Sequence, residues 1–501
     1  MFSTSRYRNS LRNCTCLVDN SIHIASSVEA RQEGRLKRDP SVPAHRMAGR
    51  DTMRKKLLAI AAGAAATPAL AQTPPAPAFD VAAARARIAP ILEKAYPHLD
   101  AIYKDIHAHP ELGFQETRTA ALLAGEMRQL GFTVTTGIGE TGIVAIYKNG
   151  DGPIILVRTE LDALPMEEKT GLPYASRVQQ TANGSSTFVA HSCGHDLHMA
   201  WWLGTATTLV KMKDRWSGTL MFVGQPAEEL GTGAKAMLDD GLFTRWPKPD
   251  FAFAAHVMPL PTGLVIVKDG VVSSASDAID ISFNGVGAHG SMPDKGIDPI
   301  MMGSRFVTDV QSVISREKDP KVFGVITVGS FVAGTVGNII PDRADLKLTL
   351  RSYDDATRKL LVEGVERTAR SVTDMARAPA PVITHQGGTA AVVNTTDLAQ
   401  EAATMLKAAF GSEAIFVPAS EAGGNASEDY SELVKAGIAS VFFAIGGLDP
   451  ALFAKAQADK TAIPVNHSPF FAPVPEATIK RGAEVLALAA LMALAERGAG
   501  Q

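Results

Sequence analysis

The spacing of apolar positions changes character several times along the chain. Ile88, Leu92 and Tyr96 recur at the spacing of one helix face. The run Ile-Ile-Leu-Val at 154–157 is instead continuously apolar, as expected for a strand covered on both sides. In this first part the pattern predicts helices at 81–99, 99–108, 117–130, 199–211 and 234–240, and strands at 132–134, 142–147, 153–158, 218–223 and 251–257. Such alternation predicts an α/β domain with a mixed sheet.

A second pattern begins near residue 273. It predicts a strand, a helix, two strands, a helix and an edge strand at 278–284, 299–315, 322–332, 342–351, 356–376 and 380–384. This β-α-β-β-α-β order is the ferredoxin-like arrangement, and its length suits an inserted domain. The first pattern then returns, with a helix at 396–410, a strand at 440–445 and a helix at 479–496. We therefore expect an α/β domain over 81–272 and 385–501, interrupted by an α+β domain over 273–384.

The N-terminal stretch has features of an export signal. Residues 53–71 combine a basic start, a short apolar core and small residues before a cleavage point after Ala71. The apolar core is too short to span a membrane, and Pro68 argues against a buried helix. We expect an exported protein, periplasmic or secreted, with a misassigned or disordered leader at 1–52 and a Pro/Ala-rich linker at 72–80.

Composition narrows the class of protein. The chain has 501 residues, of which 46% are hydrophobic, enough for two or three domains. A net charge of −3 does not suggest a nucleic-acid partner. Beyond the leader the only cysteine is Cys193, so a disulfide framework is not expected.

Two clusters of polar residues carry the candidate chemistry. Cys193 and His195 are too close in sequence to share a helix face, but they fit a tight loop around a metal ion, with Gly194 providing backbone freedom. Glu228 and Glu229 end a predicted strand, where adjacent side chains point in opposite directions. That geometry would set a metal ligand beside a free base. A single Glu pair is usually solvated and a single buried His is usually structural; together they predict a hydrolytic metal site.

Short motifs surround these clusters in a fixed order. They are HAHPEL at 107–112, RTELDALP at 158–165, HSCGHDLH at 191–198, QPAEE at 225–229, AHVMP at 255–259, GAHGSMP at 287–293, GTVGNIIP at 334–341, SEDY at 427–430 and NHSP at 466–469. In this order the motifs resemble the aminoacylase, hippurate hydrolase and auxin-conjugate amidohydrolase branch of the two-metal exopeptidases. The resemblance implies the α/β exopeptidase domain of that family, with the inserted domain as its lid and dimerisation domain.

The resemblance also implies a metal centre. The ligands of two divalent ions would be Cys193, His195, Glu229, His256 and His467, with the thiolate bridging the ions. Cys and His ligands favour zinc, although manganese, cobalt and nickel are alternatives. The histidines at 107, 109, 191 and 198 would have supporting or structural roles.

Further roles follow from the same resemblance. Glu228 would be the general base toward a metal-activated water, and Asp162 would orient a ligand, although a strand-end Asp can also cap a turn. His289 would stabilise the oxyanion, within its own subunit or across a homodimer. Asn338 would bind the substrate carboxylate, together with Arg351 unless that residue is simply a surface charge.

The sequence departs from the family pattern at two positions. Glu160 replaces an Asp in the motif at 158–165, and Asp294 follows Pro293 where relatives often have His. The expected function is metal-dependent hydrolysis of the amide bond of N-acyl amino acids or related small molecules that carry a carboxylate. The alternatives are a carboxypeptidase or dipeptidase acting on short peptides, and a non-catalytic binding protein with the same fold.

Overall fold

The computed structural model describes residues 79–182 and 184–497. The leader at 1–52, the signal segment at 53–71 and residues 72–78 of the linker lie outside the described residues. Within the described ranges, no helix combines the length and the apolar character needed to cross a membrane.

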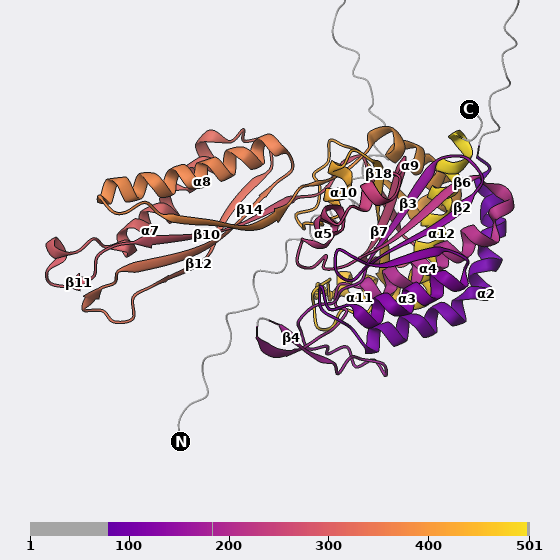
Figure 1. Ribbon diagram of the computed structural model, residues 1–501, viewed down its shortest axis with the longest axis horizontal. Coiled ribbons are helices and arrows are strands. Elements are labelled where there is room, and N and C mark those ends of the chain that lie inside the picture. The colour runs from indigo at the N-terminus through magenta and orange to yellow at the C-terminus, as the bar shows by residue number, and fades with distance from the viewer. Residues whose placement is uncertain (1–78, 183, 498–501) are drawn as a thin grey trace, which may run out of the picture. The chain divides into compact units, whose positions relative to one another are not determined.

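A mixed sheet of eight strands organises the larger part of the fold (Figure 1). Its order is β1-β2-β6-β3-β7-β18-β8-β17, and the inner strands β6, β3, β7 and β18 run parallel. The strands are β1 (Thr133–Ile138), β2 (Gly142–Asn149), β3 (Ile154–Glu160), β6 (Gly218–Gln225), β7 (Phe251–Pro261), β8 (Val265–Lys268), β17 (Ala414–Val417) and β18 (Ala439–Leu448). The mixed α/β fold expected from the apolar pattern is confirmed.

Helices cover both faces of this sheet. On β3, Ile155 and Val157 belong to one apolar cluster and Leu156 to another, because successive side chains point to opposite faces. The first cluster includes side chains of α2 (Val81–Ala108), α3 (Thr117–Gln129), α4 (His195–Lys211), α9 (Thr396–Phe410) and α12 (Pro475–Arg497). The second includes side chains of α5 (Gly233–Asp239), α6 (Leu242–Arg245) and α10 (Ser431–Lys435). The sheet is therefore buried on both sides, which leaves its strand ends for chemistry.

Two helix boundaries differ from the sequence-based expectation. The helices predicted at 81–99 and 99–108 are one helix, α2, which contains Pro90 and Pro97. A single apolar face from Ile88 to Ile106 packs into the core, and this burial outweighs the cost of the prolines. Helix α4 begins at His195 and not at Met199, so a predicted metal ligand belongs to its first turn.

A second sheet has four antiparallel strands in the order β12-β14-β10-β15. Its elements are β10 (Ala275–Asn284), α7 (Pro299–Asp309), β12 (Gly324–Ala333), β14 (Arg343–Ser352), α8 (Asp355–Ala376) and β15 (Val382–Thr389), with a π-helical turn at Val313–Glu317. The chain order is β-α-β-β-α-β, and α7 and α8 share an apolar cluster with the sheet. A small ribbon of β11 (Ala288–His289) and β13 (Ile339–Ile340) extends from it.

The chain enters and leaves this second sheet through paired strands. Strand β9 (Gly270–Ser273) lies antiparallel to β16 (Val392–Asn394), with Val392 opposite Ser273. Strand β15 continues to Thr389, beyond residue 384. The remaining elements are the hairpin β4 (Gln179–Ala182) and β5 (Ser185–Phe188) and the helix α11 (Pro450–Asp459).

Candidate metal centre

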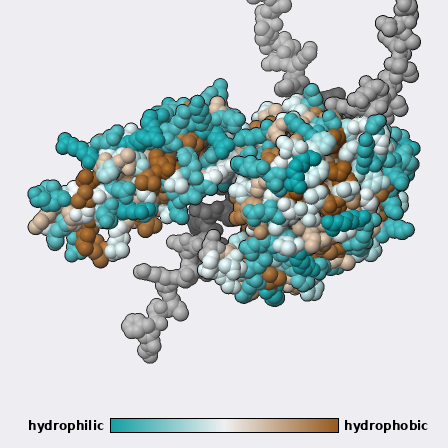
Figure 2. Space-filling view, in the orientation of Figure 1, coloured by the Kyte–Doolittle hydropathy of each residue, from teal (hydrophilic) through white to brown (hydrophobic). Residues whose placement is uncertain are grey.

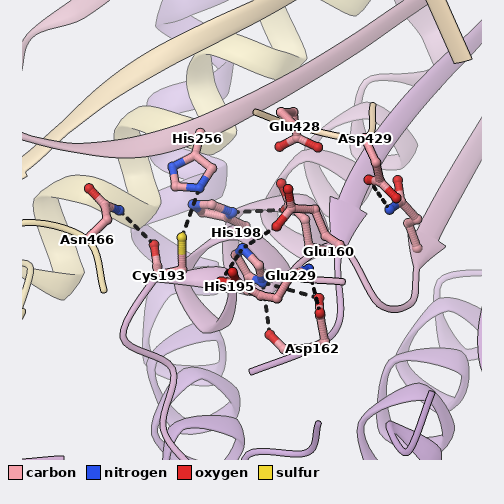
Figure 3. Close-up of polar contacts among 12 residues, drawn as sticks. Glu160, Asp162, Cys193, His195, His198, Glu229, His256, Glu428, Asp429 and Asn466 are labelled. Carbon is pink, nitrogen blue, oxygen red and sulfur yellow. Dashed lines mark hydrogen bonds and ion pairs between the residues drawn. The ribbon is translucent and has the colours of Figure 1, made fainter. Parts of the chain in front are cut away.

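Three neighbouring strands bring the candidate residues to one edge of the large sheet. Strands β6, β3 and β7 are parallel neighbours, so their carboxyl ends meet there. Asp162 follows β3, Glu228 and Glu229 follow β6, and His256 is the middle residue of β7. Figure 3 shows Asp162, Glu229 and His256 among the labelled side chains of this region.

Gly194 determines how the Cys193 loop approaches β7. Its φ is +93°, and a Cβ at this position would lie 2.5 Å from Val257 Cγ1. Only glycine meets both conditions without strain. The close approach sets Cys193 Sγ 3.3 Å from His256 Nε2, while His195 starts α4.

Two histidines are oriented by backbone carbonyls. His195 Nδ1 donates to the backbone carbonyl of Asp162 at 2.9 Å, and His256 Nδ1 donates to the backbone carbonyl of Val257 at 2.8 Å. Because a carbonyl only accepts, each Nδ1 carries the proton and each Nε2 offers a lone pair to the centre. Within the described residues, His195 Nε2 and Glu229 Oε1 are buried without a hydrogen-bond partner. These unpartnered atoms are what a metal ion would satisfy.

The two glutamates occupy a turn and do not extend β6. The strand ends at Gln225, and Ala227 has a φ of +48°. Their carboxylates therefore do not point in opposite directions: Glu228 Oε2 and Glu229 Oε1 lie 3.7 and 3.9 Å from His195 Nε2. The expectation of opposed side chains was wrong, because the chain turns before it reaches the pair.

Asp162 supports two candidate ligands from a fully buried position. Its carbonyl orients His195, and its carboxylate Oδ2 accepts the Glu229 backbone N–H at 2.9 Å. The structure thus connects Asp162 to the centre through hydrogen bonds.

His467 comes from a distant segment and closes the set. Its backbone N–H donates to the Ser192 oxygen at 2.8 Å, and its φ is +66°. Asn466 Nδ2 donates to the carbonyls of Cys193 and Val257 at 3.0 and 3.1 Å. His467 Nε2 then lies 3.4 Å from Glu229 Oε2, and its side chain is 56% exposed, which marks the solvent-open side.

The donor atoms form two overlapping groups. One contains Cys193, His195 and His256, the other Cys193, Glu229 and His467, and within each group the donor atoms lie within 4.8 Å of one another. Cys193 is common to both, as a bridging thiolate would be. Thiolate, imidazole and carboxylate are zinc-type donors, so the residues present fit two metal ions.

The electrostatics of the centre favour bound cations. Burial and the Glu229 carboxylate raise the pKa of the Cys193 thiol, and burial with neighbouring carboxylates raises the pKa of Glu228. Burial lowers the pKa of His195, but Asp162 and nearby carboxylates outweigh it and raise that pKa to about 10. The centre thus gathers negative groups that are costly to ionise together without positive charge.

His198 is not free to serve as a ligand. Its Nδ1 donates to Glu160 Oε2 at 2.9 Å, and its Nε2 accepts the Val257 N–H at 2.9 Å. The other oxygen of Glu160 contacts the buried Arg158. The longer side chain at 160 therefore connects the arginine and the histidine, and it stays outside the ligand set.

Glu428 and Asp429 belong to the SEDY motif at 427–430, but neither was predicted as a site residue. Both are buried, and they lie 2.7 and 3.3 Å from Arg158 Nη2. Asp429 also accepts the Ala234 N–H, while Glu428 has an oxygen near Glu228. Arg158 directly follows the apolar run at 154–157, so its burial and its need for carboxylate partners could have been expected from the sequence.

The candidate residues of the smaller sheet lie apart from this cluster of contacts. His289 ends β11 opposite Ile339, and Asn338 directly precedes β13; both are exposed, and the Gly290 N–H donates to the Asn338 carbonyl at 2.8 Å. Arg351 on β14 has a buried Nη1 with no partner in the described part of the chain. In the same part, no hydrogen bond or ion pair joins these three residues to the metal ligands.

Comparisons with known proteins agree with this geometry. Residues 156–492 match peptidase family M20/M25/M40. Hippurate hydrolase of Campylobacter jejuni is 39% identical over 273 residues, covering 54% of this chain and 68% of that protein. Thermostable carboxypeptidase 1 of Saccharolobus solfataricus is 36% identical over 276 residues, covering 54% and 67%. The crystal structure of Bacillus subtilis YXEP protein, a dinuclear metal-binding peptidase of the M20 family, has a TM-score of 0.64 and 26% identity, covering 80% of this chain and 99% of that one.

The family resemblance expected from the ordered motifs is confirmed. The chain belongs to peptidase family M20/M25/M40, and it is a hydrolase of amide or peptide bonds.

Proposed function

We propose that this protein hydrolyses the amide bond of N-acyl amino acids or related small amides that carry a free carboxylate. The observation that carries the proposal is the Glu228 carboxylate, which lies 3.7 Å from His195 Nε2 beside the donor cluster. A base at that distance from a ligand atom can reach a water that attacks a bound amide.

Cys193, His195, Glu229, His256 and His467 would hold two divalent ions, with zinc favoured over manganese, cobalt or nickel because of the thiolate and imidazole donors. When bound, the ions would polarise the amide carbonyl and lower the pKa of the attacking water.

Glu228 would move the proton. It accepts a proton from water as the new C–O bond forms, then donates it to the amide nitrogen as the C–N bond breaks. Burial, Glu428 and Glu229 raise the pKa of Glu228, which favours its return of the proton to the leaving amine. Atoms balance, because one water yields a carboxylic acid and an amine.

The smaller sheet would contribute the contacts to substrate oxygens. The Ser291 backbone N–H donates to His289 Nδ1 at 3.1 Å, so the ring proton lies on Nε2 and can be donated to an oxyanion. Asn338, which directly precedes β13, and Arg351, whose Nη1 has no partner among the described residues, would bind the substrate carboxylate.

Two exposed apolar residues lie close to proposed ligand residues in the sequence. Leu230 follows Glu229 and is 61% exposed, and Phe470 lies three positions beyond His467 and is 55% exposed. Large apolar groups in these places support an apolar acyl or aromatic substituent on the substrate.

A substrate panel with the metal-reconstituted protein tests the function. We expect turnover of N-benzoyl and N-acetyl amino acids, with kcat reduced about 10²–10⁴-fold in Glu228→Gln. Zinc binding should persist in that variant, because Glu228 is outside the proposed ligand set. Equal rates in the parent and in Glu228→Gln would exclude Glu228 as the base.

The same panel contains dipeptides and C-terminal peptide substrates. The similarity to a carboxypeptidase supports peptide cleavage as the second candidate function. A kcat/KM for dipeptides above that for N-acyl amino acids would favour it. Zinc binding with no turnover of any amide would favour a binding protein instead.

We also propose a homodimer formed through the smaller sheet. Strand β12 is an edge of that sheet, and its Phe331 and Val332 are exposed, as are Ile300 and Met301 on α7. Figure 2 shows apolar side chains on this part of the chain. An edge strand with apolar neighbours is a pairing surface. Val332→Lys should shift the mass in light scattering from dimer to monomer, whereas Val382→Lys on the opposite edge should not. A monomeric parent would refute the dimer.

Export is proposed on the sequence features of residues 53–71 alone. Recovery of the protein outside the cytoplasm, with an N-terminus at Gln72, would support it. A full-length cytoplasmic product would contradict it.

A further inference from the structure

A buried histidine outside the ligand set lies between two carboxylates. His107, at the end of α2, approaches Asp196 Oδ2 with Nδ1 at 2.6 Å and Glu168 Oε1 with Nε2 at 3.1 Å. All three side chains are almost fully buried. The rings of Tyr103 and Tyr174 pack against the imidazole.

This arrangement calls for a protonated ring. Each ring nitrogen faces a carboxylate oxygen, and an imidazole donates from both nitrogens only as the cation. Burial lowers the pKa of His107, but hydrogen bonds to Asp196 and Glu168 outweigh it and raise the pKa to about 10. The trio therefore has one positive and two negative groups, which is one net negative charge.

The first carboxylate, Asp196, lies in the first turn of α4 beside the proposed ligand His195. Asp196 follows His195 directly and accepts the Leu197 N–H at 2.9 Å in the first turn of α4. Because Asp196 follows His195 directly, a shift of the backbone at Asp196 would also move the residue that carries the His195 ring.

The second carboxylate, Glu168, belongs to a segment that contacts the loop containing His467. Glu168 accepts the Ser176 N–H at 2.6 Å, and the neighbouring Lys169 N–H donates to the Pro469 oxygen at 2.7 Å. Pro469 lies two positions beyond His467. The Glu168 segment thus supports the loop that presents His467.

We propose that His107 is a positioning residue that joins the His195 loop to the segment supporting His467, and thereby sets the affinity of the metal centre. Its two hydrogen bonds span the elements that hold these ligands. The inference rests on the ligand set of the proposed function, but not on turnover. Residues that orient metal ligands from outside change affinity by about 10–100-fold when altered.

The alternative is a salt-bridge cluster that contributes only to folding. The two ideas differ in one quantity, the metal affinity of the folded protein. A purely structural trio would lower the unfolding temperature of a variant and leave that affinity unchanged.

The experiment compares His107→Gln with His109→Gln in the full chain. His109 lies two positions away and its side chain is 53% exposed. Among the described residues, its ring bonds only to Asp105, four positions earlier. Zinc dissociation constants are measured by competition with a fluorescent chelator, at a temperature where circular dichroism shows both variants folded. We expect about 10–100-fold weaker zinc binding in His107→Gln and parent-like binding in His109→Gln.

A second variant covers a failure of His107→Gln to fold. His107→Gln with Glu168→Gln restores one net negative charge in the trio but still lacks the two-sided bridge, so it should also bind zinc more weakly. Parent-like zinc affinity in either folded variant overturns the proposal. A parent that binds zinc without hydrolysing amides would count against the proposed function alone, because this readout is binding.

Discussion

The candidate functional residues at the edge of the large sheet and those near the smaller sheet differ in burial and in hydrogen bonding. At the edge of the large sheet, Asp162 and His195 are fully buried and held by backbone hydrogen bonds. At the β11–β13 ribbon beside the smaller sheet, His289 and Asn338 are exposed, and their described hydrogen bonds are with neighbouring residues Ser291 and Gly290. The first region is organised by the fold before any ligand arrives. The second presents its polar groups to solvent.

The difference in burial suits the two regions to different ligands. Buried, oriented donors suit metal ions, whose geometry tolerates little error, whereas exposed donors on a ribbon suit a substrate that enters and leaves. Changes in the large sheet should therefore alter metal binding, and changes in the smaller sheet should alter turnover alone.

Metal removal should have the largest effect. Treatment with a chelator is expected to abolish amide hydrolysis, and added zinc should restore it. The apo protein should also unfold at a lower temperature, because an ion present at about a thousand times its Kd stabilises the native state by about 4 kcal/mol. Full activity after verified metal removal would contradict the assignment of the buried cluster.

His289→Ala tests the exposed region. We expect kcat to fall about 10²–10³-fold, as for loss of an oxyanion donor, with zinc affinity unchanged. His385→Ala is the matched control, because His385 is an exposed histidine on β15 that pairs with Glu366. A weaker zinc affinity in His289→Ala would contradict the prediction that this region affects turnover without affecting metal binding.

Asp162→Asn tests the buried region with a smaller expected effect. The new amide would present its NH2 group either to the Glu229 N–H or, if its oxygen keeps that hydrogen bond, to the His195 Nδ1–H, which lies 3.5 Å from Asp162 Oδ1. Zinc affinity should fall about 10–100-fold, and turnover at saturating zinc should be less affected. Unchanged zinc binding by titration would show that Asp162 only caps the turn.

The pH dependence of stability should show the smallest effect. The pKa of His107 is raised in the folded state to about 10, so its stabilisation is complete below the unfolded pKa of about 6.5 and is lost as pH rises toward 10. The stability difference between the parent and His107→Gln, about 1.5–3 kcal/mol at pH 6, should shrink by pH 9.5. Urea unfolding at both pH values measures it. A constant difference, like that expected for His109→Gln, would exclude a charged ring.

Much of the fold followed from local pattern. The continuous run at 154–157 became the inner strand β3, and the β-α-β-β-α-β order near 273–384 appeared as a four-stranded sheet with two helices. The division of the first helix at residue 99 was wrong, because one buried apolar face continues through α2 despite Pro90 and Pro97.

The candidate site was predicted less completely. The ligand candidates came from ordered motifs, but the turn at Ala227 reversed the expected geometry of the two glutamates. The partners of Arg158 were missed, because Glu428 lies 270 positions away and sequence spacing carries no distance information over that range.

The sequence by itself determined which side chains were available for chemistry and roughly where helices and strands occur, because residue type and periodicity are local properties. The tertiary structure alone decided which of them meet. Cys193 contacts His256 because Gly194 permits a close approach to β7, and His467 reaches Glu229 because Asn466 anchors its loop. These contacts depend on packing between distant segments, which no local pattern specifies.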